Sequence, residues 1–167
     1  MTKHCIREMT ERDLGEVCAL YVAAWKEGYK GLLPRSFLDE LSPKRWEGGR
    51  LLGDGSYVIL DGEKIAAHCY TRPAAEEKMR GWGEIQTMYA LPEYWGRGFA
   101  GELFEYAVDR LRERGFDKIY LYVLDGNERA ARFYRKHGFM PNGDTLECEV
   151  GGAAVTDTRF VKCFEEE

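Results

Sequence analysis

Residues 95–101 form the segment of the sequence with the clearest chemical potential. They read Trp-Gly-Arg-Gly-Phe-Ala-Gly, follow a strand-like run at 82–91 and open a helix-like run. The first N–H groups of a helix have no intrahelical acceptor and lie at the positive end of the helix dipole, and glycines let an anion approach the backbone closely. The loop therefore predicts a phosphate-binding site. The alternative is a glycine-rich turn that binds nothing.

Two common phosphate-binding motifs compete for this loop. A Walker motif requires a Lys followed by Ser or Thr, and neither follows here. Gly96, Gly98 and Gly101 do have the GxGxxG spacing of a dinucleotide-binding turn. That turn normally follows the first strand of a parallel sheet and has an acidic residue after the next strand, for which Asp125 is only a loose match. The dinucleotide interpretation is therefore disfavoured.

Two segments together resemble a known family. Residues 89–100 read YALPEYWGRGFA and residues 127–139 read NERAARFYRKHGF. They are similar to the Q/R-x-x-G-x-G/A acetyl-CoA motif and the Asn-x-x-Ala…Tyr-x-x-x-Gly-Phe motif of the Gcn5-related N-acetyltransferases (GNAT family). Gly98 and Ala100 match, whereas Trp95 departs from the family at the Q/R position. The resemblance covers essentially the whole chain.

The resemblance implies an enzyme that transfers an acetyl group from acetyl-CoA to a primary amine of a small molecule or peptide by direct attack. A protein N-terminal acetyltransferase and a catalytically silent acyl-CoA-binding or sensor domain are the alternatives. The family's strand before the loop pairs with the pantetheine arm, and its loop amides bind the pyrophosphate. The implied coenzyme-binding residues are Met88, Tyr89, Ala90, Gly96, Arg97, Gly98, Phe99, Ala100, Gly101 and Asn127.

The resemblance also implies the catalytic residues. Tyr134 matches the tyrosine that serves as general acid, and a plain core aromatic is its alternative role. Glu84 matches the catalytic glutamate of one branch of the family, with a paired polar strand residue as the alternative. The position that carries the acidic residue in other members is Tyr122 here. Strand alternation predicts that Gln86 points the same way as Glu84 and helps to position the substrate.

Further side chains are candidates for binding the amine acceptor or the coenzyme phosphates. Trp25 and Tyr29 share a helix face and either wall an amine pocket through cation–π contact or belong to the core. Arg97, Arg129 and Arg132 either neutralise coenzyme phosphates or are solvated surface charges. A nucleophilic role for Cys69 or Cys148 is disfavoured because neither has a neighbour in sequence that would lower its pKa. Structural roles are expected for the three histidines, which are His4, His68 and His137.

The elements that must position these residues follow from periodicity and turn signals. Strands are expected at 3–8, 56–60, 64–71, 82–91 and 118–124, and two more around Gly151-Gly152. Helices are expected at 11–28 behind a Thr10 cap, from Pro34 to Leu41, from Pro43 through 46–52, from the glycine loop to about 114, and from Asn127 to His137. This order predicts a mixed α/β fold, a mostly antiparallel central sheet flanked by helices, with residues 1–167 as one domain.

Composition sets limits on partners and location. The chain has 167 residues and a net charge of −5, which disfavours nucleic acid and fits a cationic acceptor. Five cysteines without a CxxC pair predict neither disulfides nor a metal site, so the expected compartment is the reducing cytoplasm. No leader-like or membrane-spanning run is present in the sequence. The C-terminal strands are a possible homodimer contact.

Overall fold

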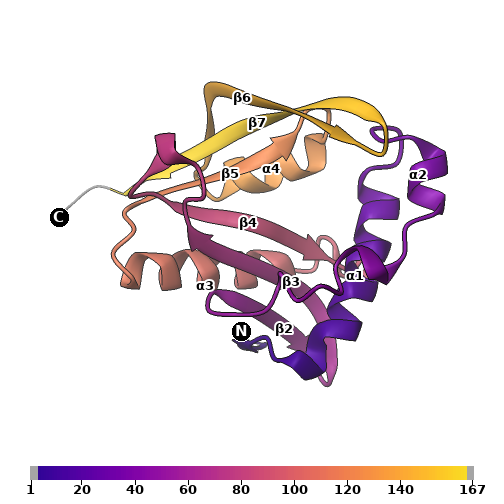
Figure 1. The fold of residues 1–167 in the computed structure, drawn as a ribbon. Coiled ribbons are helices and arrows are strands. Elements are labelled where there is room, and N and C mark those ends of the chain that lie inside the picture. The colour runs from indigo at the N-terminus through magenta and orange to yellow at the C-terminus, as the bar shows by residue number, and fades with distance from the viewer. Residues whose placement is uncertain (1–3, 165–167) are drawn as a thin grey trace.

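The computed structural model describes residues 4–164, which form one seven-stranded sheet with helices on both faces (Figure 1). The strands lie in the order β1-β2-β3-β4-β5-β7-β6, and only β4 and β5 pair in parallel among the described strands. The strands are β1 Cys5–Glu8, β2 Ser56–Asp61, β3 Lys64–Pro73, β4 Gly83–Ala90, β5 Lys118–Leu124, β6 Met140–Val150 and β7 Ala153–Cys163. The α-helices are α1 Leu14–Gly28, α2 Arg35–Asp39, α3 Phe99–Glu113 and α4 Glu128–Lys136. The predicted mixed, mostly antiparallel sheet is confirmed.

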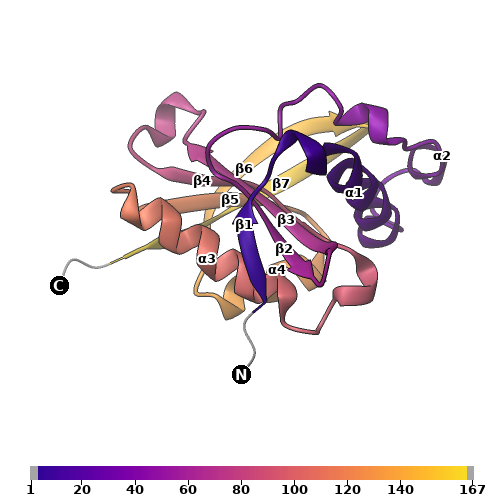
Figure 2. The same cartoon turned by 90° about the horizontal axis from the view of Figure 1, so that it is seen from below.

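The alternation of side chains along the strands builds a core on each face of the sheet. In β2, Tyr57 and Ile59 pack with α3 and α4, whereas Val58 and Leu60 pack with α1 and α2. Figure 2 shows α1 and α3 on opposite sides of the strands. Since a β4–β5 parallel pair needs a crossover, α3 connects these two strands and covers one face.

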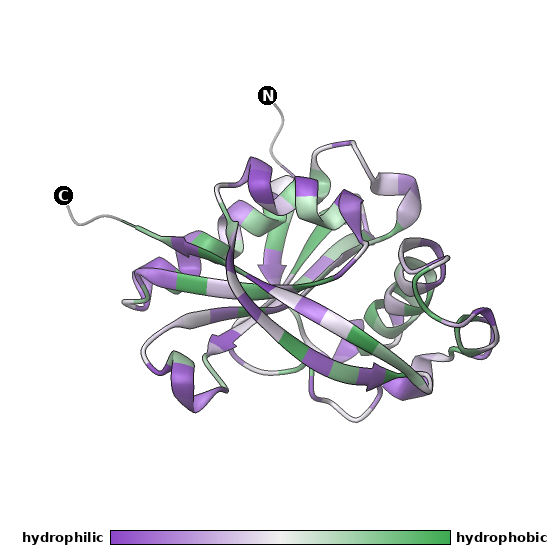
Figure 3. Ribbon diagram, turned by 90° about the horizontal axis from the view of Figure 1, so that it is seen from above, coloured by the Kyte–Doolittle hydropathy of each residue, from purple (hydrophilic) through white to green (hydrophobic). Residues whose placement is uncertain are grey.

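The two C-terminal strands extend beyond the rest of the sheet as a long hairpin. They turn at Gly151 and Gly152, which adopt φ values of 60° and 80°, as a tight hairpin turn requires. Figure 3 shows hydrophilic and hydrophobic residues alternating along β6 and β7. The tip of the hairpin lies beside α2 (Figure 1), so segments far apart in sequence meet there. The predicted turn at these glycines is confirmed.

The predicted helix at 46–52 is wrong. The structure has only a 3₁₀ turn at Pro43–Arg45, after which the chain continues through turns. Gly49 has a φ of 79°, which a right-handed helix does not admit. Trp46 and Leu51 are nevertheless buried, so their apolar character reflects packing against α1 and not a helical face.

Two smaller outcomes concern the ends of the predicted elements. The first strand spans Cys5–Glu8, and Lys3 of the predicted range lies outside the described residues. The backbone N–H of Thr10 donates to the Asp13 carboxylate at 2.8 Å, and this capping box opens a 3₁₀ turn that leads into α1. No helix among residues 4–164 is long and apolar enough to cross a membrane.

Candidate active site

The site is created where β4 and β5 part. These strands pair only at Gly83↔Ile119 and Glu84↔Tyr120, near their N-terminal ends. Immediately afterwards β4 contains a bulge, because Thr71 of β3 pairs with Ile85 while Tyr70 pairs with Thr87. Gln86 is the extra residue, and bulges bend the strand that holds them. The two strands then diverge and leave an opening between them.

A cavity of about 730 Å³ fills this opening. Its walls come from β4, β5, the glycine loop, α3 and α4, and Tyr29 at the end of α1 closes one side. Lining residues predicted from the sequence are Met88, Tyr89, Ala90, Gly96, Arg97, Gly98, Ala100, Gly101, Asn127, Tyr134, Tyr29 and Gln86. One cavity therefore brings together most of the residues singled out in the sequence.

The glycine loop supplies unpaired backbone donors at one end of the cavity. Gly98 is the N-cap of α3 and has a φ of 91°, a conformation that favours glycine. The N–H groups of Phe99, Ala100 and Gly101 lie in the first turn, where no intrahelical acceptor exists. A 15-residue helix dipole adds partial positive charge at the same place. This end of the cavity is suited to a phosphate or pyrophosphate group.

Trp95 takes a structural part in this loop. Its indole Nε1–H donates to the carbonyl oxygen of Ala90 at 3.0 Å, which ties the loop back to the end of β4. The guanidinium of Arg129 stacks on the indole ring 3.6 Å from its centroid. Both Trp95 and Arg129 line the cavity. No carboxylate lies within ion-pair distance of Arg129 in the described part of the chain, so its charge is available to an anionic ligand.

Asn127 combines a helix cap with a free donor group. Its side-chain oxygen accepts a hydrogen bond from the backbone N–H of Ala130 at 3.2 Å, which caps α4. The amide nitrogen carries two hydrogens and has no partner among the described residues. Since Asn127 lines the cavity, this nitrogen can donate to a ligand there.

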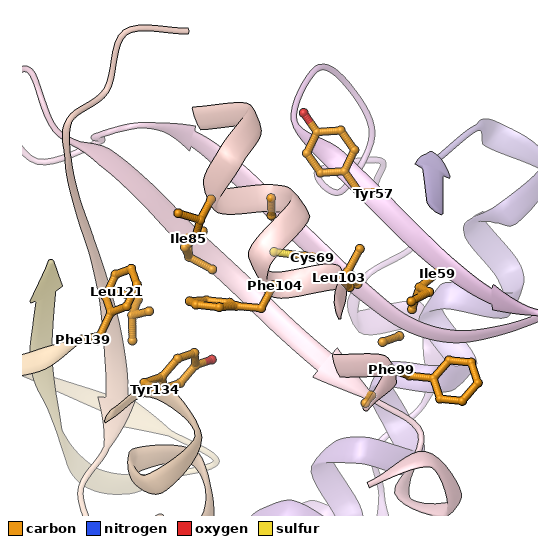
Figure 4. Close-up of a cluster of buried hydrophobic side chains, with 14 of the residues drawn as sticks. Tyr57, Ile59, Cys69, Ile85, Phe99, Leu103, Phe104, Leu121, Tyr134 and Phe139 are labelled. Atoms are coloured by element: carbon orange, nitrogen blue, oxygen red, sulfur yellow. The ribbon is translucent and has the colours of Figure 1, made fainter. Parts of the chain in front are cut away.

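Tyr134 lies on the wall that α4 presents to the cavity. Its ring packs beside Phe104 with 5.4 Å between centroids, near Leu121 and Phe139 (Figure 4). Within residues 4–164 its hydroxyl forms no hydrogen bond. Burial raises the pKa of Tyr134, and the nearby Tyr89 adds to this effect. The phenol therefore stays protonated at neutral pH and is available as a proton donor.

A buried hydrogen-bonded chain supports the opposite wall. The Tyr21 hydroxyl donates to Thr87 Oγ1 at 2.6 Å and lies 2.7 Å from His68 Nδ1. His68 Nε2 lies 2.6 Å from the Ser56 hydroxyl. Burial lowers the pKa of His68 to about 3, so the ring is neutral. Because the proton of Tyr21 is used toward Thr87, His68 donates from Nδ1 and accepts at Nε2.

These contacts fix Thr87, which lines the cavity directly after the bulge. Next to it, the hydroxyls of Tyr29 and Tyr89 are 2.9 Å apart, which joins α1 to β4. Burial raises the pKa of both tyrosines. The wall formed by β4 and the end of α1 is therefore lined by hydroxyl groups and aromatic rings held in place by the fold.

Residues 14–139 match the acetyltransferase (GNAT) family model. The chain belongs to the GNAT family of acetyltransferases. An uncharacterized N-acetyltransferase of Archaeoglobus fulgidus is 30% identical over 133 residues, which cover 77% of this chain and 88% of that protein. A mycothiol acetyltransferase of Beutenbergia cavernae is 42% identical over 59 residues, which cover 35% of this chain and 20% of that protein.

The fold is also that of solved GNAT structures. The PaiA N-acetyltransferase of Thermoplasma acidophilum, solved in complex with coenzyme A, superposes with a TM-score of 0.78 at 18% identity. The superposition covers 98% of this chain and 100% of the PaiA chain. The similarity of fold extends over both helical layers and the long C-terminal hairpin.

The structure places Glu84, the base that the family resemblance implies, outside the cavity lining of this GNAT chain, and its carboxylate accepts a hydrogen bond from Arg72 Nε at 2.6 Å. This placement favours the alternative of a paired polar strand residue. The bulge at Gln86 is the physical reason, because an extra residue breaks the simple alternation that relates Glu84 to Gln86. Gln86 is exposed in the cavity, whereas Glu84 is buried in an ion pair.

Three further residues singled out in the sequence do not line the cavity. The Phe99 ring is buried and stacks on His4 with 3.9 Å between centroids, while its backbone N–H stays among the first-turn donors. Trp25 packs against Trp46 and Tyr29, as its core alternative predicts. Arg132 also lies outside the lining.

Sequence reasoning missed residues at the loop end of the cavity. His4 and His137 line it, and their rings contact Glu102 and Glu105 of α3. These contacts join residues about 98 and 32 positions apart, so no local pattern reveals them. The local spacing of Glu102 and Glu105 on the first turns of α3 is also that of an ordinary solvated helix face, so it does not indicate these contacts.

Proposed function

We propose that this chain is an acetyl-CoA-dependent N-acetyltransferase that acts on a primary amine of a small molecule or peptide. The observation that carries the proposal is the cavity itself, which joins free helix-terminal amides at one end to the Tyr134 hydroxyl. A long, flexible thioester coenzyme needs both features in one groove. Membership of the GNAT family supports the same reaction.

The proposed coenzyme site follows the length of the cavity. The pyrophosphate binds the N-cap Gly98 and the first-turn amides of Phe99, Ala100 and Gly101, with Arg97 and Arg129 nearby. The pantetheine arm lies along Met88 to Ala90 of β4, where the departure of β5 leaves backbone groups unpaired. The side-chain nitrogen of Asn127 donates to the arm from the β5 side.

The proposed chemistry is direct attack of a neutral amine on the thioester carbonyl. A C–N bond forms, the C–S bond breaks, and the thiolate takes a proton from the Tyr134 hydroxyl. A backbone N–H of β4 polarises the carbonyl oxygen. The acceptor arrives mainly as an ammonium ion, because alkylamines have a pKa of about 10, and it loses one proton to solvent water before attack. As the amide forms, the nitrogen loses a second proton, which restores the Tyr134 hydroxyl, so that the products are the acetamide, the coenzyme A thiol and one proton in solvent.

The proposed location is the cytoplasm. All five cysteines are free thiols in the structure, and Cys18 and Cys69 are buried. Unpaired cysteines are typical of proteins in a reducing compartment.

The direct test is release of thiol from acetyl-CoA with a panel of alkylamines, diamines, amino-acid amides and N-terminal peptides. We expect at least one amine to be acetylated, and we expect acetyl-CoA to raise the melting temperature. A chain with a Tm shift but no turnover is the silent binding domain. Absence of both effects at saturating acetyl-CoA contradicts the proposal.

A further inference from the structure

One carboxylate beside the cavity has no cationic partner. Five acidic side chains are buried or half-buried in the described residues, namely Asp13, Glu76, Glu84, Glu102 and Asp157. The first four lie within 4.0 Å of Arg7, Arg159, Arg72 and His4, respectively. Asp157 has no Lys, Arg or His within that distance in the part of the chain that the structure describes. Among the described residues, its one side-chain hydrogen bond comes from the Cys148 thiol, 3.5 Å away.

Strand register places Asp157 next to a residue that lines the cavity, although Asp157 itself is not among the lining residues. On β7 it pairs with Leu124 of β5, and Leu124 lines the cavity. Leu124 and Val155, two residues before Asp157, both pack with the cluster that contains Tyr29 and Tyr89. Side chains two residues apart on a strand share a face. Asp157 therefore faces the same side of the sheet as these aromatic residues.

The electrostatics agree with this placement. Burial raises the pKa of Asp157, and the charge of the nearby Asp125 raises it further. The Asp157 charge in turn contributes to the raised pKa of Tyr29 and of Tyr89, after the larger effect of burial. An uncompensated carboxylate in such a position is costly to the fold, so a bound cation would lower its free energy.

Residues between α1 and the middle of α2 approach both the β6–β7 turn and the end of β5. A Cβ on Gly151, in the β6–β7 turn, would overlap the Phe37 side chain of α2. A Cβ on Gly126, after β5, would lie 2.8 Å from the Leu32 side chain. Phe37 of α2 thus packs closely against the hairpin, and Leu32 of the α1–α2 connection packs against the end of β5. Figure 1 shows α2 beside the tip of the hairpin.

We propose that Asp157 binds the ammonium group of the acceptor, and that the acceptor carries positive charge without a neighbouring carboxylate. This inference rests on the proposed function and adds the substrate class. The cation lies between the Asp157 carboxylate and the aromatic surface of Tyr29 and Tyr89, an arrangement that favours ammonium groups. A carboxylate next to the amine would meet Asp157 and Asp125, and like charges exclude it.

The test compares two acceptors that differ in one carboxylate, L-alaninamide and zwitterionic L-alanine. The variant is Asp157→Asn, which keeps the shape and removes the charge. Glu147→Gln is the matched control, because Glu147 is an exposed carboxylate on the same hairpin. The two substitutions change the net charge by the same amount. Asp157→Glu restores the charge at the same position.

We expect Asp157→Asn to raise the KM for L-alaninamide about tenfold to a hundredfold, with the KM for acetyl-CoA unchanged. The preference for L-alaninamide over L-alanine should shrink by a similar factor. Comparing this preference between variants cancels the different amine pKa values of the two acceptors. Glu147→Gln should match the wild type, and Asp157→Glu should recover part of the loss. An unchanged KM and preference in Asp157→Asn would overturn the proposal.

A binding measurement separates this proposal from the proposed function. If the wild-type chain acetylates no amine, the proposed function fails, and 1,4-diaminobutane is titrated into the coenzyme A-loaded protein. A Tm increase in the wild type and in Glu147→Gln that is lost in Asp157→Asn would still support Asp157 as the cation site. No increase in the wild type, or an equal increase in all three proteins, would overturn it.

Discussion

The Arg72 guanidinium and the Glu84 carboxylate face each other across the β3–β4 ladder, 2.6 Å apart. The Glu84 side chain is 7% exposed and the Arg72 side chain is 35% exposed. The carboxylate is therefore the buried member of the pair. Such a pair holds the strands together just before the bulge at which β4 leaves β5. The pair is therefore positioned to stabilise the strands next to the bend that opens the cavity.

Glu84→Gln should accordingly affect stability more than the pH dependence of catalysis. Loss of a hydrogen-bonded charge pair with one buried member costs about 1–3 kcal/mol in the free energy of unfolding. Urea denaturation measures this loss, and the acidic limb of the pH–rate profile should keep its position. If that limb disappears in Glu84→Gln while the fold is intact, Glu84 is the base after all.

Asn127 offers a way to separate helix capping from coenzyme binding. Asn127→Ser keeps an oxygen that caps α4 but removes the amide donor, whereas Asn127→Ala removes both. We expect both variants to bind acetyl-CoA more weakly, and only Asn127→Ala to lose about 1 kcal/mol of stability. Calorimetric titration and urea unfolding measure the two effects. Equal acetyl-CoA affinity in Asn127→Ser and the wild type would rule out a hydrogen bond from the Asn127 amide to the coenzyme.

Gly98→Ala tests the anion site at the start of α3. An alanine at a φ of 91° costs about 1–2 kcal/mol, although no atom lies within 4 Å of the added Cβ. The N-cap should shift, and acetyl-CoA affinity should fall about tenfold or more because the first-turn amides lose their alignment. Gly15→Ala is the control, since this helical glycine also has open space and no positive φ. Unaltered affinity in Gly98→Ala would contradict the loop assignment.

The buried His68 predicts an acid-sensitive fold. Its pKa is lowered from 6.5 to about 3, so the unfolded chain binds more protons than the folded chain between these values. Stability is complete above pH 6.5 and falls as the pH decreases toward 3, by about 1.4 kcal/mol for each pH unit. Asp13 has a pKa of about 2, lowered from 3.8. Its titration therefore reduces stability only below about pH 3.8 and does not affect the slope between pH 7 and pH 5. Urea unfolding at pH 7 and pH 5 gives the slope.

His68→Gln is the control for this slope. Its overall stability is expected to be lower because the chain from Ser56 to Thr87 is interrupted. Between pH 7 and pH 5 it should lose clearly less stability than the wild type. The same slope in both proteins would place the titrating group elsewhere.

Local patterns predicted the parts of the site that lie close together in sequence. The loop at 95–101, the cap at Asn127 and the helix that carries Tyr134 all follow from turn residues and helical spacing. The order of elements and the mixed sheet followed as well, because the strand runs and hairpin turns were strong. These features depend on interactions within a few residues of each other.

The errors have tertiary causes. The bulge at Gln86 is invisible in the sequence of β4, because it depends on how β3 pairs with it. The same bulge moved Glu84 out of the site and brought Gln86 into it. Asp157 was overlooked because its significance lies in an absent partner and in the register of β7 with β5. The apolar spacing around Trp46 resembles that of a helix face, but Trp46 lies in a turn and is buried by packing against other elements.

Tyr134→Phe gives the most direct test of the account, which makes the Tyr134 hydroxyl the proton donor in the cavity. Single-turnover acetyl transfer is measured at saturating acetyl-CoA with the best amine of the panel, alongside the dissociation constant of acetyl-CoA. Removing one hydroxyl should slow the chemical step about a hundredfold or more and leave the dissociation constant nearly unchanged. An unchanged single-turnover rate in Tyr134→Phe would contradict the account.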